Sequence, residues 1–213
     1  MKVYAHYKGR CTDGNSYRWR TLLQFGDSWK IIGSAVMINP GSAWPLNAEL
    51  PIQDNDVLLQ LNQFCDKDAW YAFSDDTTMR FIGSLFKHLY QYRNGSSELN
   101  GVIQIFNLMN IMEENLDKAK ERFKNASQPL AQTTAEDIAN LSGPIYLGWG
   151  SVGKDINFYN AAKEFFDAVI CRYEGKYLDH NFKRNPFYHP RYLMHYGRNK
   201  KECKKLLEEF CRG

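Results

Sequence analysis

The sequence predicts one α/β domain in three layers, an α/β/α arrangement with a mostly parallel central sheet and an N-terminal β-hairpin. Short apolar runs that end in Asn, Gly or Pro alternate along the chain with segments of helical period. Strands that alternate with helices are typical of right-handed crossovers and parallel sheets. The 213 residues include no stretch of linker composition, so we expect one hydrophobic core over residues 1–213.

The first elements expected along the chain are a hairpin and a buried strand. Residues 17–23 alternate large apolar with polar side chains, and turn residues at 26–28 lead into 29–32, which predicts a hairpin. Residues 34–38 form a short apolar run, typical of a strand that is buried on both faces. That run stops at Asn39.

The rest of the chain alternates helices with further strands. Segments of helical period lie at 56–64, 79–89, 116–123, 135–141, 155–170 and 203–210. Thr77 or Thr78 is expected to cap the second of them. Compact apolar runs at 101–106 and 144–147 predict strands, and a last strand is expected near 176–178.

Composition excludes several classes of protein. Hydrophobic residues make up 44 % of the chain and charged residues 24 %, which indicates a folded globular protein and not a disordered one. No apolar segment approaches the roughly 20 residues that a membrane-spanning helix needs. The five cysteines are scattered without a C-x-x-C pair, so we expect a reducing cytoplasm, no metal site and no other cofactor. Neither a phosphate loop of P-loop type nor a nucleophile elbow is present.

Charge is distributed unevenly along the chain. Residues 172–213 hold eleven Lys or Arg against five Asp or Glu, whereas the whole chain has a net charge of +3. Such a segment can attract phosphate groups, or it can simply form the solvated face of the last helix.

Polar residues follow the predicted strands at their carboxyl ends, where ligands bind in parallel sheets. The candidate pocket residues are Asn39, Pro40, Gly41, Ser42, Asp76, Arg80, Asn107, Trp149, Gly150, His189, Arg191 and Tyr192. Each group has a structural alternative: residues 39–41 can be an ordinary turn, Asp76 a helix cap and Trp149 a core residue.

These residue types suit the recognition of a nucleobase and a phosphate. Asn39 and Asn107 offer both a donor and an acceptor to a base edge or a water. Asp76 can orient Arg80 or hold the loop around Asn39. A neutral His189 can donate a hydrogen bond to an oxygen that gains negative charge. Other candidates there are Arg184, Arg191 and Tyr192 for a phosphate backbone and His195 as a second histidine.

The order of these motifs resembles that of an uncharacterised prokaryotic family, domain-of-unknown-function family 1643. The motifs are N-P-G-S-A at 39–43, D-D-T-T-M-R at 75–80, I-F-N-L at 105–108, G-W-G at 148–150 and N-P-F-Y-H-P-R-Y-L at 185–193. The resemblance spans about residues 17 to 193. Gly41 stands where that family usually has Ser, and the insertion between Ala43 and Asp75 is longer than expected. The family brings no established activity.

The same strand ends are distantly similar to those of the uracil-DNA glycosylase superfamily. That resemblance implies that Asn39 positions the attacking water, that Asn107 reads a pyrimidine edge and that His189 stabilises the departing base anion. It also implies that Tyr71 or Phe73 stacks on the base. The chain departs from the superfamily at Arg191 and Tyr192, which replace a small serine-containing loop, and at Met37, where glycine is common.

The function expected first is that of a glycosylase-like enzyme, which binds a nucleobase or nucleotide and acts on N-glycosidic bonds in nucleic acid. The first alternative is a non-catalytic module that binds a nucleotide or a small anion. The second is an interaction protein that uses Trp44, Trp70 and the insertion. We expect nucleic acid or a nucleotide, and no membrane, as the partner; the sequence predicts no oligomeric state.

Overall fold

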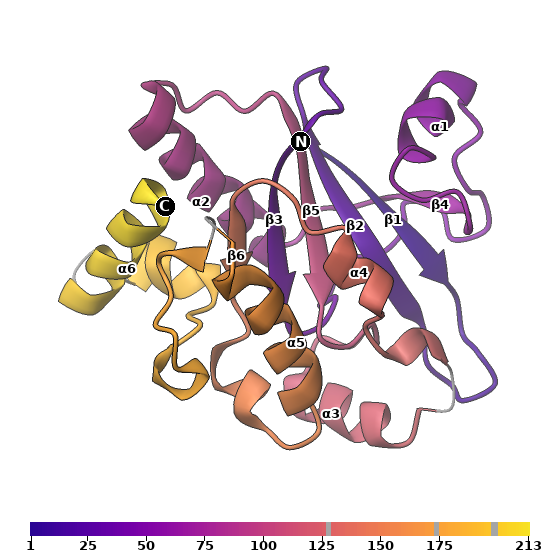
Figure 1. Ribbon diagram of the computed structural model, residues 1–213. Coiled ribbons are helices and arrows are strands. Elements are labelled where there is room, and N and C mark those ends of the chain that lie inside the picture. The colour runs from indigo at the N-terminus through magenta and orange to yellow at the C-terminus, as the bar shows by residue number, and fades with distance from the viewer. Residues whose placement is uncertain (127–128, 173–174, 197–199) are drawn as a thin grey trace.

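A computed structural model describes residues 1–126, 129–172, 175–196 and 200–213 (Figure 1). Its strands are β1 (Lys2–Lys8), β2 (Tyr17–Phe25), β3 (Ile31–Met37), β4 (Trp70–Phe73), β5 (Gly101–Asn107) and β6 (Ile145–Leu147). Its α-helices are α1 (Asn55–Leu61), α2 (Thr77–Asn94), α3 (Leu116–Lys124), α4 (Ala135–Ala139), α5 (Tyr159–Ile170) and α6 (Lys201–Arg212). Short 3-10 turns include Gly150–Lys154 and Phe182–Arg184, and a π-helical turn spans Tyr192–Tyr196.

The six strands form one mixed sheet in the order β4-β1-β2-β5-β3-β6, so the expectation of a mostly parallel sheet is wrong. β3 runs parallel to β5 and to β6, whereas the pairs β1–β2, β1–β4 and β2–β5 are antiparallel. The parallel half is the one whose strands are connected through helices. In the other half β1 and β2 are joined by a short loop, which permits only antiparallel pairing.

The N-terminal hairpin consists of β1 and β2, not of residues 17–23 paired with 29–32. A turn does follow β2, because Gly26 has a φ of +59° and the Asn100 side chain accepts hydrogen bonds from the next two backbone N–H groups. However, β5 lies between β2 and β3 and pairs with both. The local turn signal was correct and the inferred strand partner was not.

Two further elements differ from the expectation. The strand expected near 176–178 is a turn, and its aromatic residue instead enters the core, where Tyr177 stacks on Tyr146 at 6.3 Å and accepts a hydrogen bond from Leu147 N at 3.0 Å. β4, which was not expected, extends the sheet from the insertion by pairing with β1. Trp70 of β4 is only 1 % exposed, so it is a core residue.

Helix α2 begins where the sequence changes from acidic to apolar. The Asp76 side chain, and not Thr77 or Thr78, caps it by accepting from Met79 N at 2.8 Å. Gly95 ends the helix in the left-handed conformation. The buried side chains Met79, Ile82, Leu85, Phe86 and Leu89 recur at helical spacing and face the sheet.

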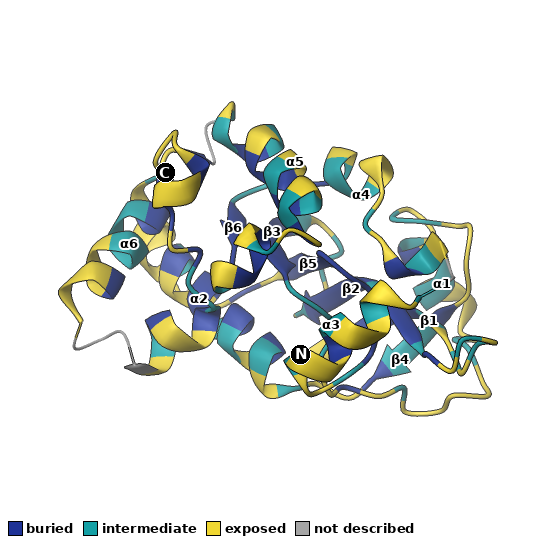
Figure 2. Ribbon diagram, turned by 90° about the horizontal axis from the view of Figure 1, so that it is seen from below, coloured by how far each residue is buried: buried dark blue, intermediate teal, exposed yellow. Residues whose placement is uncertain are grey.

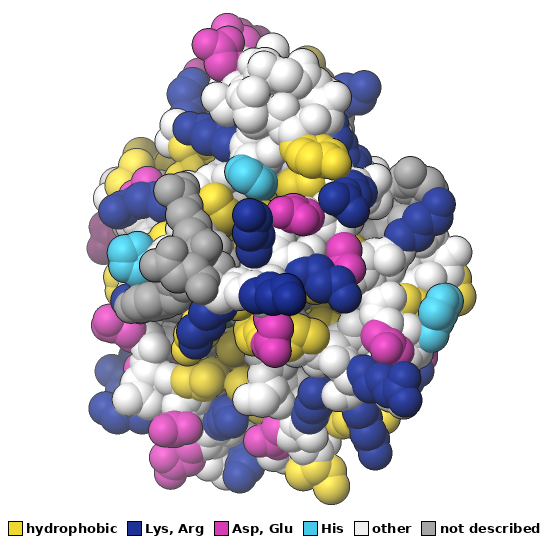
Figure 3. Space-filling model, turned by 90° about the vertical axis from the view of Figure 1, so that its left-hand side faces the viewer, with side chains coloured by type: hydrophobic (Ala, Val, Ile, Leu, Met, Phe, Trp, Pro, Cys, Tyr) yellow, Lys and Arg dark blue, Asp and Glu magenta, His cyan; other side chains and the backbone are white. Residues whose placement is uncertain are grey.

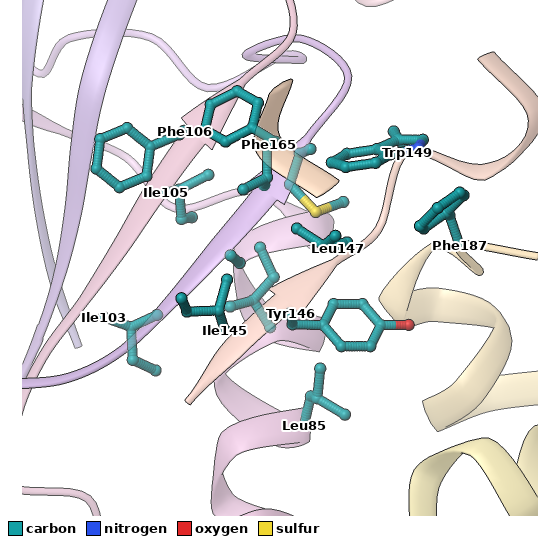
Figure 4. Packing of buried hydrophobic residues seen from close by; sticks show 14 of the residues in the cluster. Leu85, Ile103, Ile105, Phe106, Ile145, Tyr146, Leu147, Trp149, Phe165 and Phe187 are labelled. Carbon is teal, nitrogen blue, oxygen red and sulfur yellow. The ribbon is translucent and has the colours of Figure 1, made fainter. Parts of the chain in front are cut away.

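Helices cover both faces of the sheet, as a three-layer arrangement requires (Figures 1 and 2). Phe86 of α2 lies so close to β3 that a Cβ atom on Gly33 would overlap its ring. On the other side, α5 brings Phe165 against the sheet near Trp149 (Figure 4). Because β3 runs parallel to β5 and β6, the carboxyl ends of the three strands share one edge of the sheet, toward which the β3 and β5 arrows point downward in Figure 1.

None of the helices in the described ranges combines the length and the apolar composition that crossing a bilayer would require.

Candidate functional site

The loop that carries His189 packs against the carboxyl ends of β3 and β6. A Cβ atom on Gly148 would lie 3.1 Å from Met37 Sδ and 3.2 Å from Pro190 Cδ, so the loop sits directly on these strand ends. Gly150 N donates to Phe187 O at 2.6 Å, and both residues have positive φ angles, +60° and +44°. A positive φ at a non-glycine residue such as Phe187 destabilises the backbone by about 1–3 kcal/mol, so the contacts around the loop must hold it in this conformation.

Two cavities adjoin this loop. The strand-end cavity, of about 580 Å³, is lined by Ile38 after β3 and by Trp149 and Gly150 after β6. The helix-end cavity, of about 690 Å³, is lined by the first turn of α2 and by Arg191. Residues that line both are His189, Tyr192 and Lys200.

His189 is a neutral imidazole with a defined proton position. Its Nδ1 accepts a hydrogen bond from Arg191 N at 3.2 Å, so in the neutral ring the proton is on Nε2. Burial lowers the pKa of His189 to about 4; the charge of Arg191 lowers it too, and that of Asp76 opposes the shift. Nε2 lies 3.5 Å from Thr78 Oγ1, longer than a well-formed hydrogen bond. At neutral pH His189 therefore presents an N–H donor to the cavities.

Arg18, which the sequence analysis did not select, holds the turn at 39–43. Its guanidinium is only 3 % exposed; Nη1 donates to Ala43 O at 3.1 Å and Nη2 donates to Pro40 O. Asp76 Oδ2 lies 4.0 Å from Nη2, and the guanidinium lies 5.3 Å from the Phe73 ring. Burial lowers the pKa of Arg18 to about 10, and the nearby Asp76 carboxylate opposes this shift.

The local sequence around Arg18 predicts an exposed side chain, not a buried one. Residues 17–20 alternate aromatic and basic side chains, a pattern typical of a strand with one solvated face. In the structure both faces of β2 are covered, since nearly every residue along the strand is buried, and its two arginines, Arg18 and Arg20, are buried with the rest. A buried charge requires a partner, and the Asp76 carboxylate lies within ion-pair distance of Arg18.

Asp76 lies between the turn and the His189 loop. A Cβ atom on Gly41 would lie 3.3 Å from Asp76 Oδ2, and the Asp76 charge acts on His189. Arg80 pairs instead with Asp75 at 3.1 Å, and this pair is exposed. Of the two roles considered for Asp76, the geometry matches contact with the loop around Asn39 and not orientation of Arg80.

The two asparagines do not join His189 in the walls of these cavities. Asn39 Nδ2 donates to Glu113 O at 2.7 Å, and Asn107, 4 % exposed, lies opposite Met37 in the parallel register. The predicted residues that line a cavity are Trp149, Gly150, His189, Arg191 and Tyr192. Those in neither wall are Asn39, Pro40, Gly41, Ser42, Asp76, Arg80 and Asn107. The expectation that all these residues line one pocket is therefore wrong. Some of them line the two cavities, and those of the turn at 39–42 lie beside the cavities without lining them.

Comparison with known proteins adds nothing to this geometry. No family model, curated protein or solved structure matches the chain. The chemistry of the site rests on its own residues.

The aromatic candidates are mostly structural. Trp149 is fully buried between Phe165 and Phe187, which agrees with its alternative as a core residue (Figure 4). Phe73 lies under Arg18 and Tyr71 packs edge-on against Tyr7 at 5.5 Å, so neither borders the cavities.

Basic side chains border the open side of the site. Arg191 and Lys200 line the helix-end cavity, and Figure 3 shows Lys and Arg side chains gathered across the middle of the face that carries α2 and α6. Arg184 lies 3.8 Å from Asp179, and His195 lies beside Phe81 at 6.2 Å, outside both cavities. Within the described ranges, no group of three His, Cys, Asp or Glu side chains is arranged to hold a metal ion.

Proposed function

We propose that this chain binds a nucleotide unit, free or in nucleic acid, across the two cavities and acts as a glycosylase-like hydrolase of its N-glycosidic bond. The observation that carries the proposal is the position of His189, a neutral N–H donor in the walls of both cavities. A base in one cavity and a phosphate in the other would place the glycosidic bond beside this donor.

The two cavities suit the two ends of a nucleotide. The strand-end cavity has the volume of a small-molecule site, and its apolar wall residues include Ile38, Val152 and Pro186. The helix-end cavity adjoins Arg191 and Lys200, cationic side chains that attract phosphate. The shared residue Tyr192 is 53 % exposed at the boundary.

Hydrolysis of the bond requires a water at the sugar carbon and a stabilised leaving base. Water attacks the anomeric carbon, the carbon–nitrogen bond breaks, and the base departs with the bonding electron pair; the proton that the water loses ends on the released base. The Nε2–H of His189 would donate a hydrogen bond to a base oxygen as this negative charge develops. Asn39 is not a wall residue, but it directly follows Ile38, which lines the strand-end cavity, and we propose that it positions the water through Oδ1, because its Nδ2 is occupied by Glu113 O.

The enzymatic proposal is tested with oligonucleotides that contain uracil or modified bases. The expected result is formation of abasic sites by the native chain and its loss in His189→Ala and Asn39→Ala. His195→Ala is the matched control, since His195 follows the same loop but lies outside both cavities. No base release from any oligonucleotide of the panel would refute the enzymatic proposal.

A second function, a non-catalytic module that binds a nucleotide or a small anion, is favoured by the positions of Asn39 and Asn107 outside the cavity walls. It predicts that a nucleotide raises the melting temperature and is recovered chemically unchanged. In both cases affinity for nucleic acid should weaken steeply with salt, because the contacts proposed are to phosphate.

A further inference from the structure

Two consecutive carbonyl groups of the loop that carries His189 are held by β6 and the turn that follows it. Gly150 N donates to Phe187 O at 2.6 Å, and the Tyr146 hydroxyl donates to Tyr188 O. The Tyr146 hydroxyl points away from β6, toward the C-terminal part of the chain (Figure 4). The first bond joins two backbone groups, whereas the second depends on one side chain. The sequence pattern predicts only a strand here and gives the Tyr146 hydroxyl no role.

The Tyr146 hydroxyl lies in the core and needs a hydrogen-bond partner there. The residue is fully buried; its ring stacks on Tyr177 at 6.3 Å and packs edge-on against Phe210 at 5.2 Å. A phenylalanine would fill the same space, and a buried hydroxyl without a partner destabilises a protein. Burial also raises the pKa of Tyr146 well above its ordinary value, so the hydroxyl keeps its proton and remains a donor. The bond to Tyr188 O satisfies this donor.

The acceptor of this bond belongs to the peptide group that joins Tyr188 to His189. A peptide group is planar, so Tyr188 O, the His189 nitrogen and the His189 Cα atom lie in one plane. Holding the oxygen therefore holds the plane from which the imidazole side chain starts. On the other side of His189, Pro190 is held as well: a Cβ atom on Gly148 would lie 3.2 Å from Pro190 Cδ and 2.9 Å from Tyr146 Cε1. Both neighbours of His189 thus pack against the same strand end.

The direction of the imidazole follows from this backbone position. His189 Nδ1 accepts from Arg191 N at 3.2 Å, and His189 O accepts from Tyr192 N at 2.8 Å, so the residue begins a tight turn. A rotation of the peptide group before His189 would move the ring away from Arg191 N and break the side-chain bond. That bond keeps the proton on Nε2 and fixes its direction.

We infer that Tyr146 is a positioning residue for His189: its hydroxyl holds the Tyr188 carbonyl and thereby keeps the His189 Nε2–H directed at the two cavities. Tyr146 lines neither cavity, so it acts through His189 and would touch no ligand bound there. What the positioned N–H acts on rests on the function proposed above, whereas the positioning itself does not.

The test compares Tyr146→Phe with Tyr177→Phe by NMR titration of His189 in the ligand-free chain. Tyr177 is the matched control, because its ring is also buried and stacked but its hydroxyl accepts from Leu147 N of β6. Burial lowers the pKa of His189 to about 4 in the native chain. In Tyr146→Phe we expect this pKa to rise toward its ordinary value near 6.5, because the released imidazole becomes more exposed to water.

Tyr177→Phe should leave the pKa of His189 unchanged. An unchanged pKa in Tyr146→Phe, or an equal rise in both variants, overturns the inference. If Tyr146→Phe does not fold, the native chain decides the question. Its Tyr146 hydroxyl proton should exchange slowly with water and show an NOE to the Hα of His189, whose Cα lies beside Tyr188 O in the peptide plane. A hydroxyl proton that exchanges too fast to be observed contradicts the inference.

Enzyme kinetics separate this inference from the proposed function. Where the native chain releases a base, Tyr146→Phe should lower kcat about tenfold and leave KM nearly unchanged, because Tyr146 makes no contact in the cavities. A raised KM with an unchanged kcat would place Tyr146 in ligand binding and overturn the inference. Failure of the native chain to release any base counts against the proposed function, while the titration of His189 still tests the role of Tyr146.

Discussion

Replacing Arg18 by methionine removes the buried charge that holds the turn at 39–43. The substitution leaves Pro40 O and Ala43 O without their donor, and leaves the Asp76 carboxylate, whose side chain is 10 % exposed, without its counter-charge. Methionine retains contact with Phe73, so the loss is mainly electrostatic. Breaking a buried ion pair by removing one partner typically costs about 3–5 kcal/mol, and we expect a loss near the lower end of that range.

Arg80→Met is the matched control for Arg18→Met. It is the same chemical change one turn inside α2, but the pair of Arg80 with Asp75 has side chains that are 63 % and 38 % exposed. Exposed pairs contribute about 0–1 kcal/mol. Urea unfolding followed by circular dichroism gives both free energies of unfolding. Similar losses in the two variants would refute the conclusion that the Arg18 guanidinium holds the turn.

Three further predictions concern the same region. Asp76→Asn keeps a capping side chain but removes the negative charge that faces Arg18. In the native chain this charge raises the pKa of His189, so NMR titration of the variant should show the pKa of His189 falling below about 4. Because the folded pKa of His189 is below the unfolded value near 6.5, its contribution to stability is complete above pH 6.5 and is lost as pH falls toward 4. Native protein should therefore lose about 2 kcal/mol more than His189→Gln between pH 7 and pH 5 in urea unfolding, and equal losses would contradict this. Gly41→Ala should lower the free energy of unfolding by more than the roughly 1 kcal/mol expected for Gly95→Ala, since both glycines have positive φ but only Gly41 faces Asp76 closely. Equal losses of stability in the two variants would show that the contact with Asp76 is unimportant.

Local sequence signals predicted most elements of the fold. The spacing of apolar residues after Asp76 indicated α2, and the apolar runs that stop at Asn39, Asn107 and Gly148 indicated β3, β5 and β6. These features depend on residues close together in the chain. Strand order does not, so nothing near residues 26–28 revealed that β5 would lie between β2 and β3.

The contrast between local sequence signals and long-range packing applies to the candidate site as well. The loop with His189 and the Trp149-Gly150 turn were identified because strand ends and turn residues are local features, and they do line cavities. Arg18 was missed because its importance comes from burial, which depends on the distant segments that cover both faces of β2. A basic or imidazole side chain in an alternating strand is indistinguishable in sequence from a solvated one.

The most direct test of the central claim is a crystal structure of the chain with a pyrimidine nucleoside monophosphate. The account predicts the base in the strand-end cavity beside Gly150, the phosphate near Arg191 and Lys200, and His189 Nε2 within hydrogen-bond distance of a base oxygen. A nucleotide bound away from His189, or no nucleotide in either cavity at saturating concentration, would contradict it.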